Sequence, residues 1–346
     1  MVTKESTGCT EVLLLRNHEV RSLVSDNELE LIDLIGEAYL AHATGKTSLP
    51  TSTFLQFPWE SGDRIIALPA FLGSEPQVAG IKWIASFPRN IGKGWDRASA
   101  VLILNSIETG RPTAILEASV ISAKRTAASA ALAAKALHVE RPVLAIGLIG
   151  CGMINFETAQ FLRIVFPEVV SAKLFDSDSR RAEEFRQKQL ARSPNWEVTI
   201  AKDHEEVLRE AEVVSIATTA TVPHMHSLGS YRGSETVLHL SLRDISPEVL
   251  LQCDNVVDDP DHVCRARTSL DLAEQMVGHR QFIRATLGDV LLGRAPGRFN
   301  STMPVIFSPF GLGILDLAVA RWVVRRAVER EMGTVIDSFL PEGHSW

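Results

Sequence analysis

The chain has 346 residues, of which 45% are hydrophobic and 22% charged, and its formal net charge is −7. This length suffices for two domains with a large buried core. The mild acidity and the lack of a basic run argue against nucleic acid or an anionic membrane as a partner. The N-terminus has no apolar signal core, so we expect a cytoplasmic protein. The cysteines are too few and too scattered for a disulfide framework: Cys9, Cys151, Cys253 and Cys264.

The first third of the chain is dominated by expected strands. An amphipathic helix is expected over 26–42, and a loop rich in Thr, Ser and Pro over 44–58. Several strands in series without intervening helices indicate an antiparallel first domain. These strands are expected at residues 11–16, 64–72, 78–87, 100–105 and 113–117.

The pattern changes near residue 121, where an alanine-rich helix is expected over 122–137. Strands and helices then alternate, which is typical of a parallel, doubly wound sheet. The strands are expected at 143–149, 172–175, 197–201 and 213–217, with helices from 155, 179 and 204.

A late helix over 314–330 is expected to return to the first domain. The sequence thus predicts an α/β protein with a Rossmann dinucleotide-binding domain over 122–317. The second predicted domain is an α+β antiparallel domain for substrate binding and dimerisation, over 1–121 with 318–346.

The strongest local motif is a glycine-rich turn. Gly150 and Gly152 follow the apolar strand 143–149, a helix comes next, and Asp176 ends the following strand, 26 positions after Gly150. Such glycines allow a tight turn and a close approach of backbone to a pyrophosphate, which the helix N-terminus also attracts. Asp176 would accept hydrogen bonds from the adenosine ribose and repel a 2′-phosphate, so the motif predicts NAD.

Two features depart from the usual form of this motif. Asn155 stands where a third glycine would lie, and it is bulkier than glycine where the helix should pack against the strand. Arg180 and Arg181 follow Asp176 and leave NADP as the less favoured cofactor.

Three charged residues have competing interpretations. Lys82 fits a lysine whose ammonium reaches solvent from a strand edge. Asp316 fits an acid favoured by the dipole in the first turn of a helix. Arg125 lies in the alanine-rich helix, where a guanidinium requires either a ligand or an internal acid such as Glu117.

Further polar residues follow expected strands of the Rossmann half. His239 and the run Ser241–Asp244 come after one such strand, where ligands of parallel sheets bind. Ser308 and Gly311 are candidates for the nicotinamide end of the cofactor cleft. A zinc site of Cys253, His262 and Cys264 lacks both a C-x-x-C pair and a clear fourth ligand, so no metal is expected.

Several segments together resemble the ornithine cyclodeaminase/μ-crystallin family, and the resemblance covers nearly the whole chain. These segments are 80–83 (GIKW), 116–130 (LEASVISAKRTAASA), 147–152 (GLIGCG), 287–298 (LGDVLLGRAPGR) and 307–316 (FSPFGLGILD). Three others, 63–69, 150–157 and 239–245, are most similar to one branch of the family. That branch oxidises N-(2-amino-2-carboxyethyl)-L-glutamate with NAD to make 2,3-diaminopropionate for siderophores or peptide antibiotics, and it also carries Asn at the third glycine.

The resemblance implies a homodimer joined through the antiparallel domains, NAD as cofactor and an amino-acid-derived substrate. A substrate with three carboxylates calls for several cations, for which Lys82, Arg97 and Arg125 are the candidates. Lys82 is also the candidate to take the amine proton or activate water. The expected cofactor contacts are Arg125, Gly150, Gly152, Met153, Ile154, Asp176, Thr218, Ser241 and Ser308.

Two departures limit the assignment. The run His239–Asp244 stands where cyclodeaminases carry a Gly-Asp-x-Pro-Gly-Lys type of loop, which counts against ornithine cyclisation. Gln56 stands where the branch carries an arginine, so one carboxylate contact is in question. The alternatives are another enzyme of the family, such as an alanine or imino-acid dehydrogenase or a cyclodeaminase, or a non-catalytic cofactor binder resembling μ-crystallin.

Overall fold

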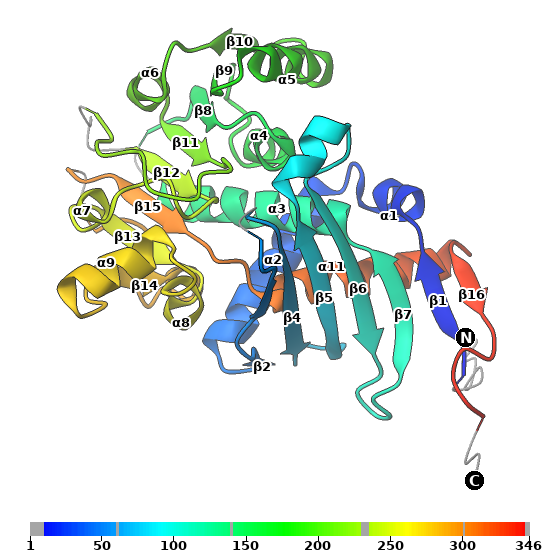
Figure 1. Ribbon diagram of the computed structural model, residues 1–346. Coiled ribbons are helices and arrows are strands. Elements are labelled where there is room, and N and C mark those ends of the chain that lie inside the picture. The colour runs from blue at the N-terminus through cyan, green and yellow to red at the C-terminus, as the bar shows by residue number, and fades with distance from the viewer. Residues whose placement is uncertain (1–9, 60–61, 139–140, 230–234, 300–301, 343–346) are drawn as a thin grey trace. The chain divides into compact units, whose positions relative to one another are not determined.

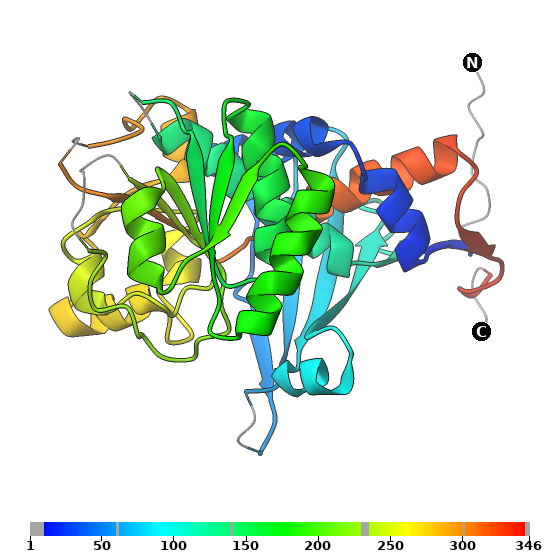
Figure 2. The ribbon, with the colours of Figure 1, turned by 90° about the horizontal axis from the view of Figure 1, so that it is seen from above.

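The computed structural model describes residues 10–59, 62–138, 141–229, 235–299 and 302–342 (Figures 1 and 2). The chain divides into two compact units. Unit 1 comprises residues 1–27, 44–122 and 313–346, and unit 2 comprises 28–43 and 123–312. No helix of the described residues is long and apolar enough to cross a bilayer.

Unit 1 contains an eight-stranded sheet in the order β16-β1-β7-β6-β5-β4-β2, with β3 also paired to β4. Its neighbouring strands are antiparallel except for β1, which runs parallel to β7. The expectation of a purely antiparallel domain is therefore wrong at this one pair. The strands are β1 (Val12–Leu15), β2 (Thr47–Ser48), β3 (Thr53–Gln56), β4 (Arg64–Leu72), β5 (Val78–Ser86), β6 (Ala98–Asn105), β7 (Pro112–Glu117) and β16 (Thr334–Ile336).

The region 44–58, expected to be a loop, carries the short strands β2 and β3. The four residues of β3 show no apolar–polar alternation that would mark a strand, so the pairing with β4 decides their conformation. The helix α1 (Asn17–Val24) was likewise not predicted, whereas α11 (Gly313–Glu329) agrees with the late helix and lies in unit 1. The 3-10 helix η1 (Pro88–Lys93) connects β5 to β6.

Helix α11 packs on one face of β4, β5 and β6, as Figure 1 shows. The approach is close because glycines face it. A Cβ on Gly80 would lie 2.2 Å from the carbonyl oxygen of Ile103 and 3.1 Å from Leu317 of α11. A Cβ on Gly313, the first residue of α11, would lie 3.1 Å from the carbonyl oxygen of Leu68. The N-terminus of α11 is thereby fixed beside β4.

Unit 2 contains an entirely parallel sheet in the order β10-β9-β8-β11-β12-β15-β13-β14. Helices lie on both of its sides in Figure 2, which confirms the predicted doubly wound Rossmann domain. The strands are β8 (Ala145–Ile149), β9 (Ser171–Phe175), β10 (Glu197–Ile200), β11 (Val213–Ile216), β12 (Thr236–His239), β13 (Asp254–Val257), β14 (Ile283–Thr286) and β15 (Val305–Ser308).

The helices of unit 2 include one from the start of the chain, because α2 packs with α4 and α10 rather than with the strands that follow it in sequence. Helices α2 and α10 approach closely at Gly288, where an added Cβ would lie 2.7 Å from the Cβ of Ala43. Helix α3 begins in unit 1 and continues in unit 2. The helices are α2 (Glu28–Ala43), α3 (Ser119–Leu137), α4 (Met153–Val165), α5 (Ser179–Arg192), α6 (His204–Glu210), α7 (Pro247–Leu250), α8 (Pro260–Val263), α9 (Ser269–Val277) and α10 (Leu287–Leu291).

The order of the strands sets the position of the binding crevice. The chain runs from β8 to β9 and β10 on one side, and then returns to β11 on the other side of β8. Ligands of such sheets bind where this reversal leaves a crevice at the carboxyl ends of the strands. Gly150 and Thr218 both follow strands at this reversal.

Candidate active site

The turn between β8 and α4 has the backbone that a dinucleotide site requires. Gly150 has φ of 90°, and a Cβ there would lie 2.3 Å from the carbonyl oxygen of Ala217, so no other residue fits without strain. Gly152 is the N-cap of α4, and a Cβ there would meet no protein atom within 4 Å. The protein itself leaves this space open beside a helix N-terminus, which fits a pyrophosphate.

Asp176 is fixed at the end of β9 by two backbone groups. The N–H of Cys151 donates to its Oδ2 at 2.7 Å, and the N–H of Asp178 donates to its Oδ1 at 2.9 Å. Each oxygen retains a lone pair that can accept a ribose hydroxyl. Asp178 also forms an ion pair with Arg180, whose Nη2 lies 3.6 Å from Asp178 Oδ2. The arrangement fits NAD better than NADP.

Asn155 replaces the third glycine by bonding to the backbone around it. Its side chain is fully buried, and Nδ2 donates to the carbonyl oxygens of Ile149 at 2.9 Å and of Gly150 at 2.7 Å. Its Oδ1 accepts from the hydroxyl of Ser215 on β11 at 2.7 Å. The hydrogen bonds of the Asn155 amide therefore link the end of β8 to β11.

Asp244 joins the polar residues at the carboxyl ends of β11 and β12. Its buried carboxylate accepts hydrogen bonds from the hydroxyls of Thr218 and Ser241. Burial alone would raise the pKa of Asp244, but His239 first and then the two hydroxyls outweigh it and hold that pKa below its usual value. The carboxylate thus fixes two of the predicted cofactor residues, Thr218 and Ser241.

The chain returns Asp244 to this position through a strained turn. Leu242 is buried and has φ of 67°. This left-handed conformation costs a residue other than glycine of the order of 1–3 kcal/mol. Ser308 at the end of β15 lies in the same cluster, with its hydroxyl 3.4 Å from Nδ1 of the buried His239. The sequence places the run 241–244 after a strand of the Rossmann half but does not indicate the central role of Asp244.

Arg125 lies on α3 beside the loop that follows β15. Its side chain is buried, and a Cβ on Gly311 would lie 2.6 Å from its Nη1. The buried Asp258 fixes that loop by accepting from the N–H groups of Phe310 at 2.9 Å and Gly311 at 2.7 Å. The competing acid Glu117 accepts instead from Asn17 and from the N–H of Ser119.

Lys82 and Asp316 form a buried ion pair within unit 1. Lys82 Nζ lies 2.6 Å from Asp316 Oδ2 and donates to the hydroxyl of Ser122 at 3.3 Å. The two side chains are only 2% and 0% exposed. Lys82 is therefore not a solvent-reaching lysine at a strand edge, and Asp316 has a specific partner besides the helix dipole. Each charge lies within an apolar run of the sequence, which indicates that it needs a partner but does not identify that partner.

Arg97, the third predicted substrate cation, lies just before β6. Its Nη1 donates to the hydroxyl of Ser86 on β5 at 2.7 Å. Of the remaining predicted residues, Met153 begins α4 with an exposed side chain and Ile154 follows it half-buried.

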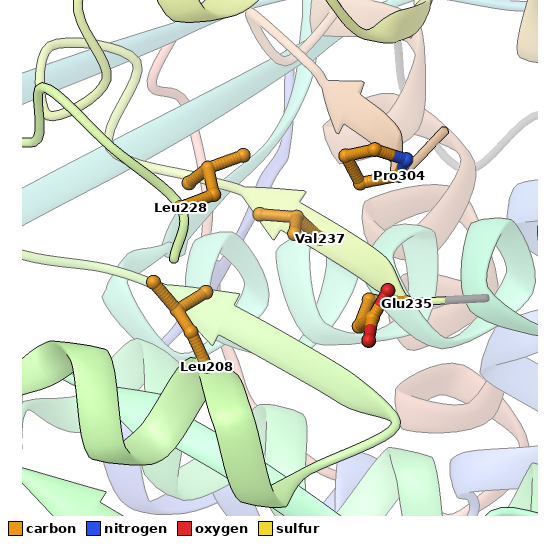
Figure 3. A pocket seen from close by; sticks show the side chains of 5 residues that line it. All are labelled: Leu208, Leu228, Glu235, Val237 and Pro304. Carbon is orange, nitrogen blue, oxygen red and sulfur yellow. The ribbon is translucent and has the colours of Figure 1, made fainter. Parts of the chain in front are cut away.

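Neither the region of Cys253 and Cys264 nor the small pocket of unit 2 resembles a metal or cofactor site. The described residues contain no group of three side chains able to hold a metal, and the thiol of Cys253 donates to the carbonyl oxygen of Val249 at 3.1 Å. Burial raises the pKa of the Cys264 thiol to about 12. Figure 3 shows a small pocket of unit 2 that is apolar apart from one carboxylate, lined by Leu208, Leu228, Glu235, Val237 and Pro304.

The parallel sheet, the glycine turn and the fixed acid after β9 define an NAD-dependent oxidoreductase. The chain belongs to the ornithine cyclodeaminase/mu-crystallin family, whose sequence profile matches residues 10–331. The predicted family is thereby confirmed.

Several relatives of known structure or activity align with this chain over nearly their whole length. N-((2S)-2-amino-2-carboxyethyl)-L-glutamate dehydrogenase of Staphylococcus aureus is 29% identical over 335 residues, covering 95% of this chain and 99% of the relative. An archaeal alanine dehydrogenase, solved as a dimer with bound NAD, has a TM-score of 0.83 at 28% identity, covering 94% and 99%. The Δ1-pyrroline-2-carboxylate reductase of Thermococcus litoralis, solved with NADH and L-proline, has a TM-score of 0.86 at 23% identity over 93% and 99%, which shows the shared fold.

Asp176→Ala is expected to weaken NAD binding at least tenfold and to narrow the preference for NAD over NADP. Each hydrogen bond to a charged acceptor contributes about 1.5–3 kcal/mol at most. Titration calorimetry with both cofactors measures the change, and Asp203→Ala, which removes an acid at the start of α6, serves as the control. Unchanged NAD affinity in Asp176→Ala would contradict the assignment.

Lys82 and Asp316 are expected to be energetically coupled. Removing one partner of a buried pair leaves the other charge poorly solvated, whereas removing both avoids that cost. Urea unfolding of Lys82→Met, Asp316→Leu and the double variant should give a coupling free energy of at least about 1.5 kcal/mol. Additive losses in the double variant would show that the pair contributes little to stability.

Proposed function

We propose that this family member catalyses the NAD-dependent oxidative cleavage of N-(2-amino-2-carboxyethyl)-L-glutamate, in a pathway to a siderophore or peptide antibiotic. The Cα of the glutamate moiety loses a hydride, and bound NAD supplies the acceptor. Water then hydrolyses the resulting iminium to 2-oxoglutarate and L-2,3-diaminopropionate, with release of one proton. The observation that carries the proposal is the buried Lys82–Asp316 pair in a chain whose relative from Staphylococcus aureus carries this activity over nearly its full length.

We assign Lys82 to proton chemistry at the reacting amine. Its ammonium is held by Asp316 at 2.6 Å and by the hydroxyl of Ser122, so its direction is fixed. A fixed ammonium can bind a substrate carboxylate or exchange a proton with the secondary amine. Asp316 is the positioning residue for this cation.

The three carboxylates of the proposed substrate require further cations. We assign Arg97 and Arg125 to them, because each guanidinium is partly or fully buried and each is held beside a loop or strand end. A guanidinium can bind a carboxylate through two parallel hydrogen bonds, which fixes the direction of the substrate as well as its charge.

The cofactor is assigned to unit 2. The Gly150–Ile154 turn receives the pyrophosphate and Asp176 the ribose, while Thr218, Ser241 and Ser308 follow the strands nearest the expected nicotinamide. Asp244 accepts hydrogen bonds from the hydroxyls of Thr218 and Ser241.

The purified protein is expected to oxidise the conjugate at least a hundredfold faster than free glutamate, alanine or ornithine. Smaller substrates leave one or more buried cations without a carboxylate, at a cost of about 1–3 kcal/mol for each. The rate of NADH formation at 340 nm with each substrate measures this, and 2-oxoglutarate and 2,3-diaminopropionate should appear in equal amounts.

The alternatives have distinct outcomes in the same assay. Faster oxidation of alanine would favour the activity of the archaeal relative and leave only the family assignment. Proline formation from ornithine without net NADH would reveal a cyclodeaminase. Binding of NAD without turnover of any of these substrates would indicate a non-catalytic cofactor binder.

We also propose that the protein is a homodimer joined through the unit 1 sheet. The face of β3–β6 opposite α11 carries three exposed apolar side chains, Leu55, Trp83 and Val101, and Trp83 pairs directly with Val101 across the strands. Trp83 is 43% exposed although it lies mid-sheet. An exposed apolar patch on a sheet face favours self-association, and the archaeal relative is a dimer.

Trp83→Glu is expected to shift the protein toward the monomer, because a carboxylate would be buried against an apolar partner surface. Sedimentation velocity at micromolar concentration measures the shift. The matched control is Trp95→Glu, which changes an exposed tryptophan after η1 and outside the sheet. A wild-type protein that sediments as a monomer would rule out this interface.

A further inference from the structure

Two arginines meet at one end of the unit 1 sheet. Arg64 is the first residue of β4 and pairs directly with Ser86, the last residue of β5. Directly opposed residues of antiparallel strands project from the same face. Arg97 reaches this position from the chain before β6, since its Nη1 donates to the hydroxyl of Ser86 at 2.7 Å. The two arginine side chains therefore lie on the face of the sheet that carries Ser86.

This face is the one that carries Lys82. Lys82 and Ser86 are four residues apart on β5, and alternate residues of a strand share a face. At about 3.4 Å per residue the two Cα atoms are roughly 13 Å apart. Lys82 pairs with Leu68, beside which α11 begins, and the helix then runs away from Arg64 toward the β4–β5 turn, where Arg321 donates to the carbonyl oxygen of Ser74. Within unit 1, α11 thus leaves the rows between Lys82 and Arg64 uncovered.

The charges at this end of the sheet are not balanced. Neither Arg64 nor Arg97 forms an ion pair with a carboxylate among the described residues, and Nε of Arg64 is buried without a hydrogen-bond partner there. The adjacent acid, Asp63, accepts instead from Arg89 at 2.7 Å and from Trp59 at 3.2 Å. Two partly buried guanidinium groups without an acid between them cost free energy unless an anion neutralises them.

The electrostatics agree with this geometry. Burial lowers the pKa of Arg64, and burial followed by the positive charge of Arg64 lowers the pKa of Arg97. The neighbouring side chain in the same row is Gln56 of β3, which pairs with Arg64 and supplies a neutral amide rather than an acid. The row therefore has donors and positive charge, and an incoming carboxylate would meet no competing acid in it.

We propose that Arg64 and Arg97 form a second anion site, which binds a carboxylate of the substrate remote from the one at Lys82. The inference rests on the proposed dehydrogenase function and deepens it by adding Arg64 to the residues that select a substrate with two separated carboxylates. An acid bound by both sites must carry two carboxylates separated by several bonds. Arg64 is then a specificity-determining residue that sequence analysis did not single out.

The test compares two ligands of equal length, 2-oxoglutarate and 2-oxopentanoate, which differ only in a terminal carboxylate or methyl group. Binding to the protein saturated with NADH is measured by titration calorimetry. We expect the wild type to bind 2-oxoglutarate at least tenfold more tightly. Arg64→Gln and Arg97→Gln should each reduce this ratio to threefold or less while changing the affinity for 2-oxopentanoate by less than twofold.

Two further variants control for charge and folding. Arg64→Lys keeps the charge without the bidentate fork and should retain part of the preference. Arg325→Gln removes an exposed arginine of α11 and should leave the ratio unchanged. A wild type without preference for the dicarboxylate would overturn the inference. So would an Arg64→Gln variant that weakens both ligands equally, since that is a structural effect.

The outcome is separable from that of the proposed function. If the conjugate is not oxidised but the dicarboxylate preference exists and depends on Arg64, the anion site stands and the proposed substrate falls. If the conjugate is oxidised and the preference is absent, the proposed function stands and the second anion site falls.

Discussion

The arrangement of unit 1 depends on one buried ion pair. Lys82 lies in the middle of a central strand, where an uncompensated ammonium would cost several kcal/mol. Asp316 removes that cost from the first turn of α11, and it can reach Lys82 only because the glycines at 80 and 313 let the helix approach the sheet. The position of the helix, the direction of the ammonium and the rows toward Arg64 that α11 does not cover follow from this contact.

In unit 2, backbone groups rather than a side-chain ion pair position the residues that we assign to the cofactor. Gly150 and the N-terminus of α4 leave room for a phosphate, and the N–H of Cys151 fixes Asp176, the acid that we assign to the ribose. Asp244 performs a similar task at the other strands, where it fixes two hydroxyls through a strained turn at Leu242. In both units a buried acid holds the groups that we expect to contact ligands.

Sequence patterns were sufficient to predict the elements that a local motif or a regular hydrophobic pattern encodes. The β8–α4 turn, the alternation after residue 143 and the helix α11 were all predicted, because each is encoded locally. The strand β3 and the place of α2 in unit 2 were not, since only tertiary pairing decides them. The partner of Lys82 lies 234 positions away, so no local pattern could indicate it. Arg64 was missed for the same reason, because only the strand register brings it to Arg97.

The central claim is that the protein removes a hydride from the Cα of an amino acid and releases the reduced cofactor. The most direct test uses N-(2-amino-2-carboxyethyl)-L-glutamate with deuterium at the glutamate Cα, followed by mass spectrometry of the products. The account predicts NADH carrying one deuterium and 2-oxoglutarate carrying none. Unlabelled NADH, or deuterium returned to the amino-acid product as in a cyclodeaminase, would contradict it.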